Sequence, residues 1–241
     1  MDPWQLRPAR DLGMSQGERL ASTAREPGLI EGMGQRTWAA AVHCYLRICH
    51  RLTVHDRELL PTQLPFVLIG NHTSHLDALV LSSLAPWRLR RWLFPIAAGD
   101  VFFETPARSA LSALLLNALP MRRKQVGRHA LDELRARLLQ DPCGFVLFPE
   151  GTRSATGELQ PFKAGLGMLV AGTGVPVVPC HLEGAFTAWP RHARLPRPGR
   201  IVVRVGSPLV FAAEPNTRPG WERIADVTAE AVRQLGAVPP A

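Results

Sequence analysis

The sequence predicts a single-domain α/β fold in which a mixed, mostly buried β-sheet is flanked by helices. Short, continuous apolar runs recur along the chain, and such runs are typical of strands covered on both faces. Between them lie segments in which apolar residues recur every three or four positions, the spacing of a helix that buries one face. Neither an internal repeat nor a long linker divides these segments, and 241 residues are ample for one core.

Six apolar runs are the predicted strands, and their continuous apolar character places them inside the sheet. They span residues 65–70, 92–97, 119–121, 144–148, 175–178 and 201–205. The longer run 175–180, which reads VPVVPC, predicts a structural strand followed by a turn. Strands that alternate with helices in this way indicate the α/β class.

An amphipathic helix is predicted near the N-terminus, over residues 36–52, because Trp38, Val42, Tyr45 and Cys49 recur at spacings of four and three. Residues 1–34 are polar and interrupted by Gly and Pro, so we expect a loosely ordered lead-in followed by one domain over residues 35–241. Further helices are predicted over residues 76–84, 106–116, 128–139, 163–171 and 221–235.

The chain is basic, with 28 Lys and Arg against 20 Asp and Glu and a net charge of +8. Residues 65–130 hold 8 basic and 3 acidic side chains, so most of the excess lies there. Such charge suits nucleic acid, an anionic membrane surface, or a phosphorylated or acidic substrate. Nucleic acid is the least favoured partner, because only 7% of the residues are aromatic and such modules interleave aromatic with basic side chains.

The cysteines and the N-terminus bear on the cellular compartment. Four scattered cysteines without a CxxC pair disfavour a disulfide framework and fit a reducing compartment. Residues 1–34 lack the apolar core of a signal peptide. No apolar run reaches the length of about 18 residues that a spanning helix needs. We therefore expect a cytoplasmic protein that is soluble or attached to a surface.

The densest polar cluster, GNHTSHLD at residues 70–77, directly follows a predicted strand. Inside a regular helix His72 and Asp77 would point about 140° apart, so they can meet only if His72 lies in the turn before the helix. Asp77 would then accept a hydrogen bond from one ring nitrogen and leave the other free to remove a proton. This pair is a candidate general base.

Two other interpretations of the cluster stay open. In one, Thr73 or Ser74 caps a helix that begins near His75, and the preceding histidine is an ordinary turn residue. In the other, the two histidines and the aspartate bind a metal, with His129 or His181 as the fourth ligand. The metal interpretation is the weaker of the two, because the motif itself offers no fourth partner.

A second cluster, FPEGTRS at residues 148–154, also follows a predicted strand. Gly151 permits a tight turn, Thr152 supplies a hydroxyl and Arg153 supplies a guanidinium, which together resemble a phosphate-binding loop. Glu150 fits such a loop only if it orients Arg153 or accepts a hydrogen bond from a substrate hydroxyl.

Two weaker signals add cations. Residues 119–124, LPMRRK, place basic side chains at the end of a predicted strand. Lys163 lies at the start of a predicted helix, where a cation opposes the helix dipole unless an anion lies between them. Each signal alone is typical of a solvated surface.

The clusters are most specific as a set, because four blocks occur in order. They read NHTSHLD (71–77), NALPMRR (117–123), FPEGTRS (148–154) and VPVVPC (175–180). In this order they resemble the PlsC-like family of glycerolipid acyltransferases, in particular 1-acyl-sn-glycerol-3-phosphate (lysophosphatidic acid) acyltransferases. The resemblance covers residues 65–210 and implies a glycerol-3-phosphate acyltransferase-like fold. The second block departs from the family pattern at Asn117 and Arg122 and retains Arg123.

The resemblance implies that a fatty acyl group moves from a thioester, acyl-CoA or acyl carrier protein, to the sn-2 hydroxyl of 1-acyl-sn-glycerol 3-phosphate. The product is phosphatidic acid, a phospholipid precursor. Other acceptors remain open: a lyso-ornithine lipid, another lysophospholipid or glycerol 3-phosphate. A metal-dependent hydrolase and a nucleic-acid module are remote alternatives.

Roles for individual residues follow from the same resemblance. His72 would be the general base and Asp77 would fix its tautomer, with direct attack on the thioester and no metal, cofactor or acyl-enzyme. Five residues would hold the phosphate and glycerol end of the acceptor: Arg123, Glu150, Gly151, Thr152 and Arg153. Lys163 is added to them on charge grounds.

A lipid acceptor implies contact with a bilayer. The candidate membrane-facing segments are residues 38–52 and 109–116, with Arg88, Arg90 and Arg91 nearby in the sequence. We expect peripheral or monotopic attachment to an anionic surface at the cytoplasmic face of the membrane. Alternatively, both helices pack on the sheet.

Overall fold

The computed structural model of the protein describes residues 11–15, 22, 29–98, 117–121 and 128–238. Several of the sequence-based predictions fall outside these ranges. They are the helix over residues 106–116, the membrane-facing segment 109–116, the basic residues 122–124 with the substrate-binding role of Arg123, and most of the lead-in over residues 1–34.

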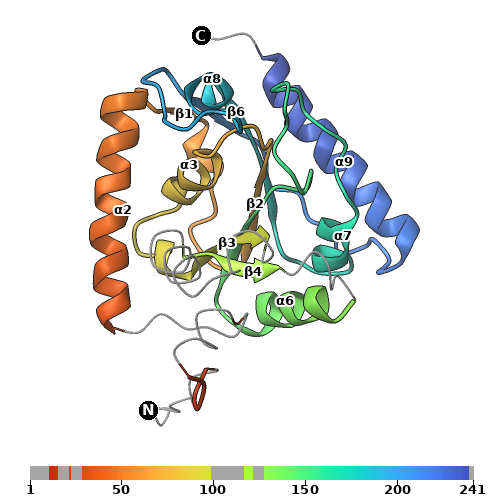
Figure 1. Cartoon of the computed structure of the whole chain (residues 1–241). Helices are drawn as coiled ribbons and strands as arrows, with labels where there is room; N and C mark the ends of the chain where they lie inside the picture. The colour runs from red at the N-terminus through yellow and green to blue at the C-terminus, as the bar shows by residue number, and fades with distance from the viewer. Residues whose placement is uncertain (1–10, 16–21, 23–28, 99–116, 122–127, 239–241) are drawn as a thin grey trace.

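Seven strands form one sheet in the order β1-β7-β6-β2-β5-β3-β4 (Figure 1). The strands are β1 Thr53–His55, β2 Phe66–Gly70, β3 Leu93–Ala98, β4 Leu119–Met121, β5 Gly144–Leu147, β6 Val177–Glu183 and β7 Val202–Val205. Strands β6 and β7 are antiparallel, whereas the other neighbouring pairs are parallel. The predicted mixed, mostly buried sheet is therefore confirmed.

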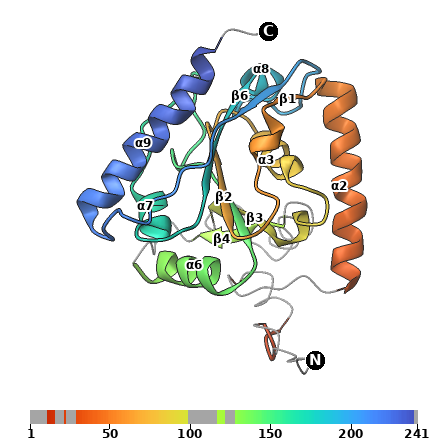
Figure 2. The ribbon, with the colours of Figure 1, turned by 180° about the vertical axis from the view of Figure 1, so that it is seen from behind.

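Helices cover both faces of this sheet, as the two opposite views show (Figures 1 and 2). The helices on the first face are α2 Leu29–His50 and α3 Asp77–Leu84. Those on the second face are α6 Arg128–Gln140, α7 Gly165–Val170 and α9 Arg218–Ala237. Three shorter helical segments are α8 Ala185–Ala188, η1 Arg57–Leu59 and η2 Arg90–Trp92.

The central strand β2 shows why the strand sequences are continuously apolar. All five of its residues are buried. Phe66 and Leu68 belong to the core beneath α2 and α3, whereas Val67 and Ile69 belong to the core beneath α6, α7 and α9. A strand between two helical layers must be apolar on both faces, so it has no polar alternation.

Two strands differ from the sequence-based prediction. Strand β1 was missed, because its three half-buried residues form no apolar run. Strand β6 continues to Glu183, so the turn predicted by residue 180 is wrong. Its second half pairs with β7, with Cys180 opposite Val205 and Glu183 opposite Val202, and this pairing extends the strand beyond Pro179.

The helix boundaries also shift. Helix α2 begins at Leu29, within the segment 1–34 that the composition marked as a lead-in. Helix α7 begins at Gly165, so Lys163 precedes the helix. Helix α9 begins at Arg218, where Pro219 occupies the first turn and its missing N–H costs nothing.

Helices α7 and α9 cross at close range through Gly167. A Cβ atom built at Gly167 would lie 2.4 Å from the Cα atom of Trp221. Trp221 is in α9, and its backbone cannot move away without displacing the helix. The absence of a side chain at position 167 is therefore a packing requirement of this helix pair.

We expect Gly167→Ala to lower the free energy of unfolding by about 1–3 kcal/mol, because the added methyl group overpacks the contact between the two helices. Urea denaturation followed by circular dichroism would measure the change. Gly165→Ala is the matched control in the same helix, since a Cβ atom there has nothing within 4 Å. Equal destabilisation by both substitutions would contradict the packing requirement.

Candidate active site

Two polar loops meet at the carboxyl-terminal edge of the sheet. Strands β2 and β5 pair in parallel, with Ile69 opposite Leu147, so both end at the same edge. The loop of residues 71–76 follows β2 and the loop of residues 148–164 follows β5. Parallel pairing thus brings the first and third sequence blocks into contact although they lie 78 residues apart.

His72 and Asp77 form the pair that the sequence predicts. The ring atom Nδ1 of His72 lies 2.9 Å from Oδ2 of Asp77. His72 lies in the turn before α3, and Asp77 is the first residue of that helix. A carboxylate oxygen accepts, so Nδ1–H donates this hydrogen bond and Nε2 is the ring nitrogen left for other partners. No described residue hydrogen-bonds to Nε2, and 21% of the His72 side chain is exposed.

The fully buried Asp77 carboxylate also holds the turn in place. Its Oδ2 accepts hydrogen bonds from the backbone N–H groups of Thr73 and Ser74, each at 2.7 Å. The capping role predicted for these two residues is wrong, because the N-cap is Leu76 and it forms no side-chain cap. The hydroxyl of Ser74 instead accepts from the Leu76 N–H at 3.1 Å. The backbone N–H groups of the turn therefore donate to Asp77, the first residue of α3, and not to a capping side chain before the helix.

The loop after β5 holds the backbone and the ring of His72. The His72 N–H donates to Oε1 of Glu150 at 2.7 Å, and the Ser154 N–H donates to the His72 carbonyl at 2.7 Å. The rings of His72 and Phe148 stack, with centroids 4.1 Å apart and planes 16° apart. These contacts hold the backbone N–H, the carbonyl and the ring of His72.

Glu150 joins the two loops from a buried position. Only 2% of its surface is exposed, and its second carboxylate oxygen accepts from the Gln160 N–H at 3.2 Å. Burial raises the pKa of Glu150 to about 7, although the two backbone hydrogen bonds oppose that rise. Both oxygens therefore face backbone amides, a bridging role that the motif alone did not predict.

Arg153 lies against a histidine that the sequence left without a preferred role. Its Nη1 lies 2.5 Å from Nδ1 and 2.7 Å from Nε2 of His75. Burial, together with the Arg153 charge, lowers the pKa of His75, so a neutral ring faces the guanidinium. The His75 ring also contacts Trp189, with centroids 4.9 Å apart. The one sequence signal for His75 was its place in the dense first block.

Lys163 and Gly151 are neighbours in space. A Cβ atom built at Gly151 would lie 2.8 Å from Nζ of Lys163, and the φ angle of +72° at Gly151 is one that favours glycine. The Lys163 N–H donates to the Pro149 carbonyl at 2.9 Å, which ties the lysine to the same loop. Thr152 is half-buried between Gly151 and Arg153.

A third segment, from the end of β6 through α8, closes the site, and no sequence motif pointed to it. The Asn71 amide donates to the Leu182 carbonyl at 2.9 Å and accepts from the Leu182 N–H at 2.8 Å. The Ser74 hydroxyl and the His75 N–H both donate to the Trp189 carbonyl, at 2.9 and 3.1 Å. Asn71 and Ser74 thus tie the first block to β6 and α8.

The structure brings most of the predicted site residues to one edge of the sheet. The ones it places there are His72, Asp77, Glu150, Gly151, Thr152, Arg153 and Lys163. Among the described residues, no group of three or more His, Cys, Asp and Glu side chains is arranged to hold a metal ion. His181, one proposed fourth ligand, lies within β6.

The raised pKa of Glu150 predicts a pH dependence of stability. Between pH 4.5 and about 7 the folded state keeps a proton that the unfolded chain releases, so the free energy of unfolding falls as the pH rises. Glu150→Gln removes this titration. From pH 5 to pH 8, wild type should therefore lose about 1–3 kcal/mol relative to Glu150→Gln in urea unfolding.

The matched control for this measurement is Glu158→Gln, which alters an exposed carboxylate of the same loop. Its stability should follow that of wild type across the range. A constant difference between wild type and Glu150→Gln would contradict the raised pKa.

Comparison with known sequences identifies relatives over the same region. A family model described as Acyltransferase matches residues 51–183. The 1-acyl-sn-glycerol-3-phosphate acyltransferase alpha of Bos taurus is 30% identical over 161 residues, which are 66% of this chain and 54% of the relative. A chloroplastic 1-acyl-sn-glycerol-3-phosphate acyltransferase of Brassica napus is 33% identical over 144 residues, 58% of this chain and 40% of the relative. The chain thus spans about half the length of the curated relatives it matches.

A solved structure shares the fold. The crystal structure of the 1-acyl-sn-glycerophosphate (LPA) acyltransferase PlsC from Thermotoga maritima aligns with a TM-score of 0.63 and 21% identity, over 88% of this chain and 82% of that chain. At this identity the match shows the fold, and it confirms the predicted α/β class. Because the family model covers more than half of the sequence, including the first and third blocks, the chain belongs to the acyltransferase family.

Proposed function

We propose that the protein transfers a fatty acyl group from acyl-CoA or acyl carrier protein to the sn-2 hydroxyl of 1-acyl-sn-glycerol 3-phosphate. The observation that carries the proposal is the bond between His72 and Asp77, which leaves Nε2 of a half-buried imidazole without a described partner. The relatives named 1-acyl-sn-glycerol-3-phosphate acyltransferases support this choice of substrate. The product is phosphatidic acid.

The proposed reaction uses His72 twice. Its Nε2 removes the proton of the acceptor hydroxyl while the hydroxyl oxygen attacks the thioester carbonyl carbon. The tetrahedral intermediate collapses, the C–S bond breaks and the imidazolium returns the proton to the thiolate. The buried Asp77 carboxylate stabilises the imidazolium and keeps the ring in one tautomer. Each proton and electron pair is accounted for without a covalent enzyme intermediate.

The cations beside the pair are suited to the acceptor phosphate. Arg153 and Lys163 are on the same loop, and Gly151 exposes backbone close to the lysine ammonium. A guanidinium and an ammonium favour an acceptor that carries phosphate over a zwitterionic ornithine lipid. We assign Thr152 and Arg123 to the same phosphate, and we assign Glu150 to positioning His72 through the bond to its N–H.

An acyl-transfer assay with one labelled thioester and a panel of acceptors tests the assignment of substrate. The panel includes lysophosphatidic acid, other lysophospholipids, a lyso-ornithine lipid and glycerol 3-phosphate, with products read by mass spectrometry. Transfer to lysophosphatidic acid at the highest kcat/KM supports the proposal. Preference for another acceptor would keep the chemistry and replace the substrate.

His72→Ala should lower kcat by about 10²–10⁴, the usual contribution of a general base. The variant must be shown to remain folded by its urea denaturation curve. His55→Ala, which alters a half-buried histidine of the edge strand β1, is the control and should retain full turnover. Near-normal turnover of a folded His72→Ala variant would exclude His72 as the base.

Arg153→Ala should raise the KM for the acceptor about tenfold or more, because a charge-assisted hydrogen bond to phosphate is lost. The KM for the thioester should change little. Arg233→Ala, on the outer surface of α9, is the control with an equal change of charge. An effect of Arg153→Ala on the thioester KM alone would place the donor, not the acceptor, at this arginine.

We also propose that α2 lies on the membrane surface. Met33, Ala40, Cys44 and Ile48 share one exposed, uncharged face of this helix, with Met33 69% and Ile48 77% exposed. Exposed arginines flank that face, as in helices that bind an anionic interface. Within the described residues, no helix combines the length and apolar character needed to cross a bilayer.

Met33→Asp combined with Ile48→Asp should abolish flotation of the protein with liposomes that contain phosphatidylglycerol at low salt, because two carboxylates then face the bilayer. Val227→Asp, which alters an exposed valine of α9, should leave flotation unchanged. If wild type fails to float, or if the double variant floats equally well, α2 is not the attachment surface.

A further inference from the structure

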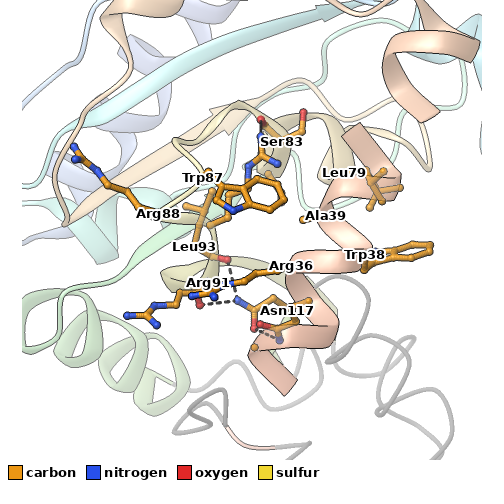
Figure 3. A pocket seen from close by; sticks show the side chains of 15 residues that line it. Arg36, Trp38, Ala39, Leu79, Ser83, Trp87, Arg88, Arg91, Leu93 and Asn117 are labelled. Atoms are coloured by element: carbon orange, nitrogen blue, oxygen red, sulfur yellow. Dashed lines mark hydrogen bonds between the residues drawn. The ribbon is translucent and has the colours of Figure 1, made fainter. Parts of the chain in front are cut away.

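A cavity of about 450 Å³ lies between α2 and the segment that joins α3 to β3 (Figure 3). Its volume falls within the range of about 300–1,000 Å³ that is typical of ligand sites. Ala39 and Val42 of α2 form part of its wall, and Leu79 and Leu93 form apolar wall beneath them. The interior therefore suits an apolar chain.

The cavity is separate from the candidate active site. Its lining includes no residue of the loops 71–77 and 148–164. Segment η2, which contributes Arg90 and Arg91, leads into the amino end of β3. Because β3 runs parallel to β5, and β5 to β2, this end of the sheet is opposite the one that carries His72.

Among the described residues, the cavity lining carries positive charge and no carboxylate. Four arginines line it, and the lining contains neither Asp nor Glu. Arg90 is the most enclosed of them, and its Nε and Nη2 donate to the carbonyls of Ala85 and Ser83, at 3.1 and 2.6 Å. Its Nη1 is buried without a described partner. A half-buried guanidinium with no carboxylate beside it favours a bound anion.

Further polar atoms at the cavity also lack partners. The hydroxyl of Ser82 and Oε1 of Gln35 are buried without a hydrogen bond to any described residue. Arg36 forms no described hydrogen bond or ion pair either, and its side chain is exposed. Buried polar groups without partners are rare in folded proteins, so these atoms indicate a ligand with polar groups at one end.

Two partly exposed tryptophans border the cavity, one beside Arg90 and one on α2. Trp87 is 51% exposed and covers the Arg90 guanidinium at 4.8 Å, while Trp38 of α2 is 36% exposed. Both line the cavity. Tryptophans are enriched where a membrane meets water, and arginine side chains there bind lipid phosphates.

From these observations we infer that the cavity binds one anionic membrane phospholipid, with its phosphate at Arg36, Arg90 and Arg91 and one acyl chain between α2 and α3. The molecule is a second lipid, distinct from the acceptor at His72. The inference rests on the proposed attachment of α2 to membranes. It adds a specific lipid site to the general attraction between the basic protein and an anionic membrane.

Dihexanoyl phosphatidylglycerol, used below the concentration at which it forms micelles, tests the site without a bilayer. Isothermal titration calorimetry should show one molecule bound per protein. Binding of dihexanoyl phosphatidylcholine, which carries no net charge, should be about tenfold weaker or more. Inorganic phosphate should also bind more weakly, because it lacks the chain. Absence of phosphatidylglycerol binding at millimolar lipid would overturn the inference.

Two variants alter the two halves of the cavity. Arg36→Gln combined with Arg91→Gln removes exposed charges, and Ala39→Phe fills apolar space; each should weaken phosphatidylglycerol binding about tenfold or more. Arg47→Gln is the control, since this exposed arginine of α2 does not line the cavity. Urea denaturation verifies that each variant is folded. Unchanged binding in both variants would overturn the site.

Two further measurements separate this site from the reaction. If Arg153→Ala abolishes phosphatidylglycerol binding while the cavity variants retain it, the lipid occupies the active site and the inference is wrong. If Ala39→Phe changes the preferred chain length of the thioester and leaves lipid binding intact, the cavity serves the donor chain instead. Persistence of lipid binding in His72→Ala would support the site even if the proposed reaction fails.

Discussion

The parallel pairing of β2 with β5 is the constraint on which the rest of the structure depends. Because the two strands are parallel, both end at the same edge of the sheet. The loops that follow them therefore lie side by side and form hydrogen bonds with each other, although they are distant in sequence. Without that register the His72 N–H and the Glu150 carboxylate would not meet at 2.7 Å. The pairing is secured by apolar residues on both faces of β2, which make the strand central to both helical cores.

The backbone N–H, the carbonyl and Nδ1 of His72 each have a hydrogen-bond partner. Its backbone is bonded to Glu150 and Ser154, its ring stacks on Phe148, and Nδ1 faces Asp77. In the proposed reaction, a histidine fixed in this way loses little freedom when a substrate arrives, which is how preorganisation assists proton transfer. Glu150 must be buried to make its bond to His72, and burial destabilises the ionised carboxylate. The raised pKa of Glu150 reflects this cost in free energy.

The two ends of the sheet have different chemistry. The carboxyl-terminal edge combines the buried Asp77 with the cations Arg153 and Lys163, which suits a reaction on a phosphate-bearing acceptor. The amino-terminal edge gathers arginines and tryptophans beside α2, without carboxylates in the cavity lining. Basic side chains thus lie at both ends of the sheet of this protein, whose net charge is +8. Both features agree with an enzyme that handles lipids at an interface.

Sequence patterns alone were enough to predict the α/β class, most of the strands and the two polar blocks that meet at one edge of the sheet, because apolar continuity and short motifs are local properties. Only the folded chain shows that Glu150 bridges two loops, that Asn71 binds β6 and Ser74 binds the end of α8, and that β6 extends beyond Pro179. It also placed His75 against Arg153. The physical reason is that these features are contacts between segments far apart in the chain, which the register of the sheet sets and local patterns do not encode.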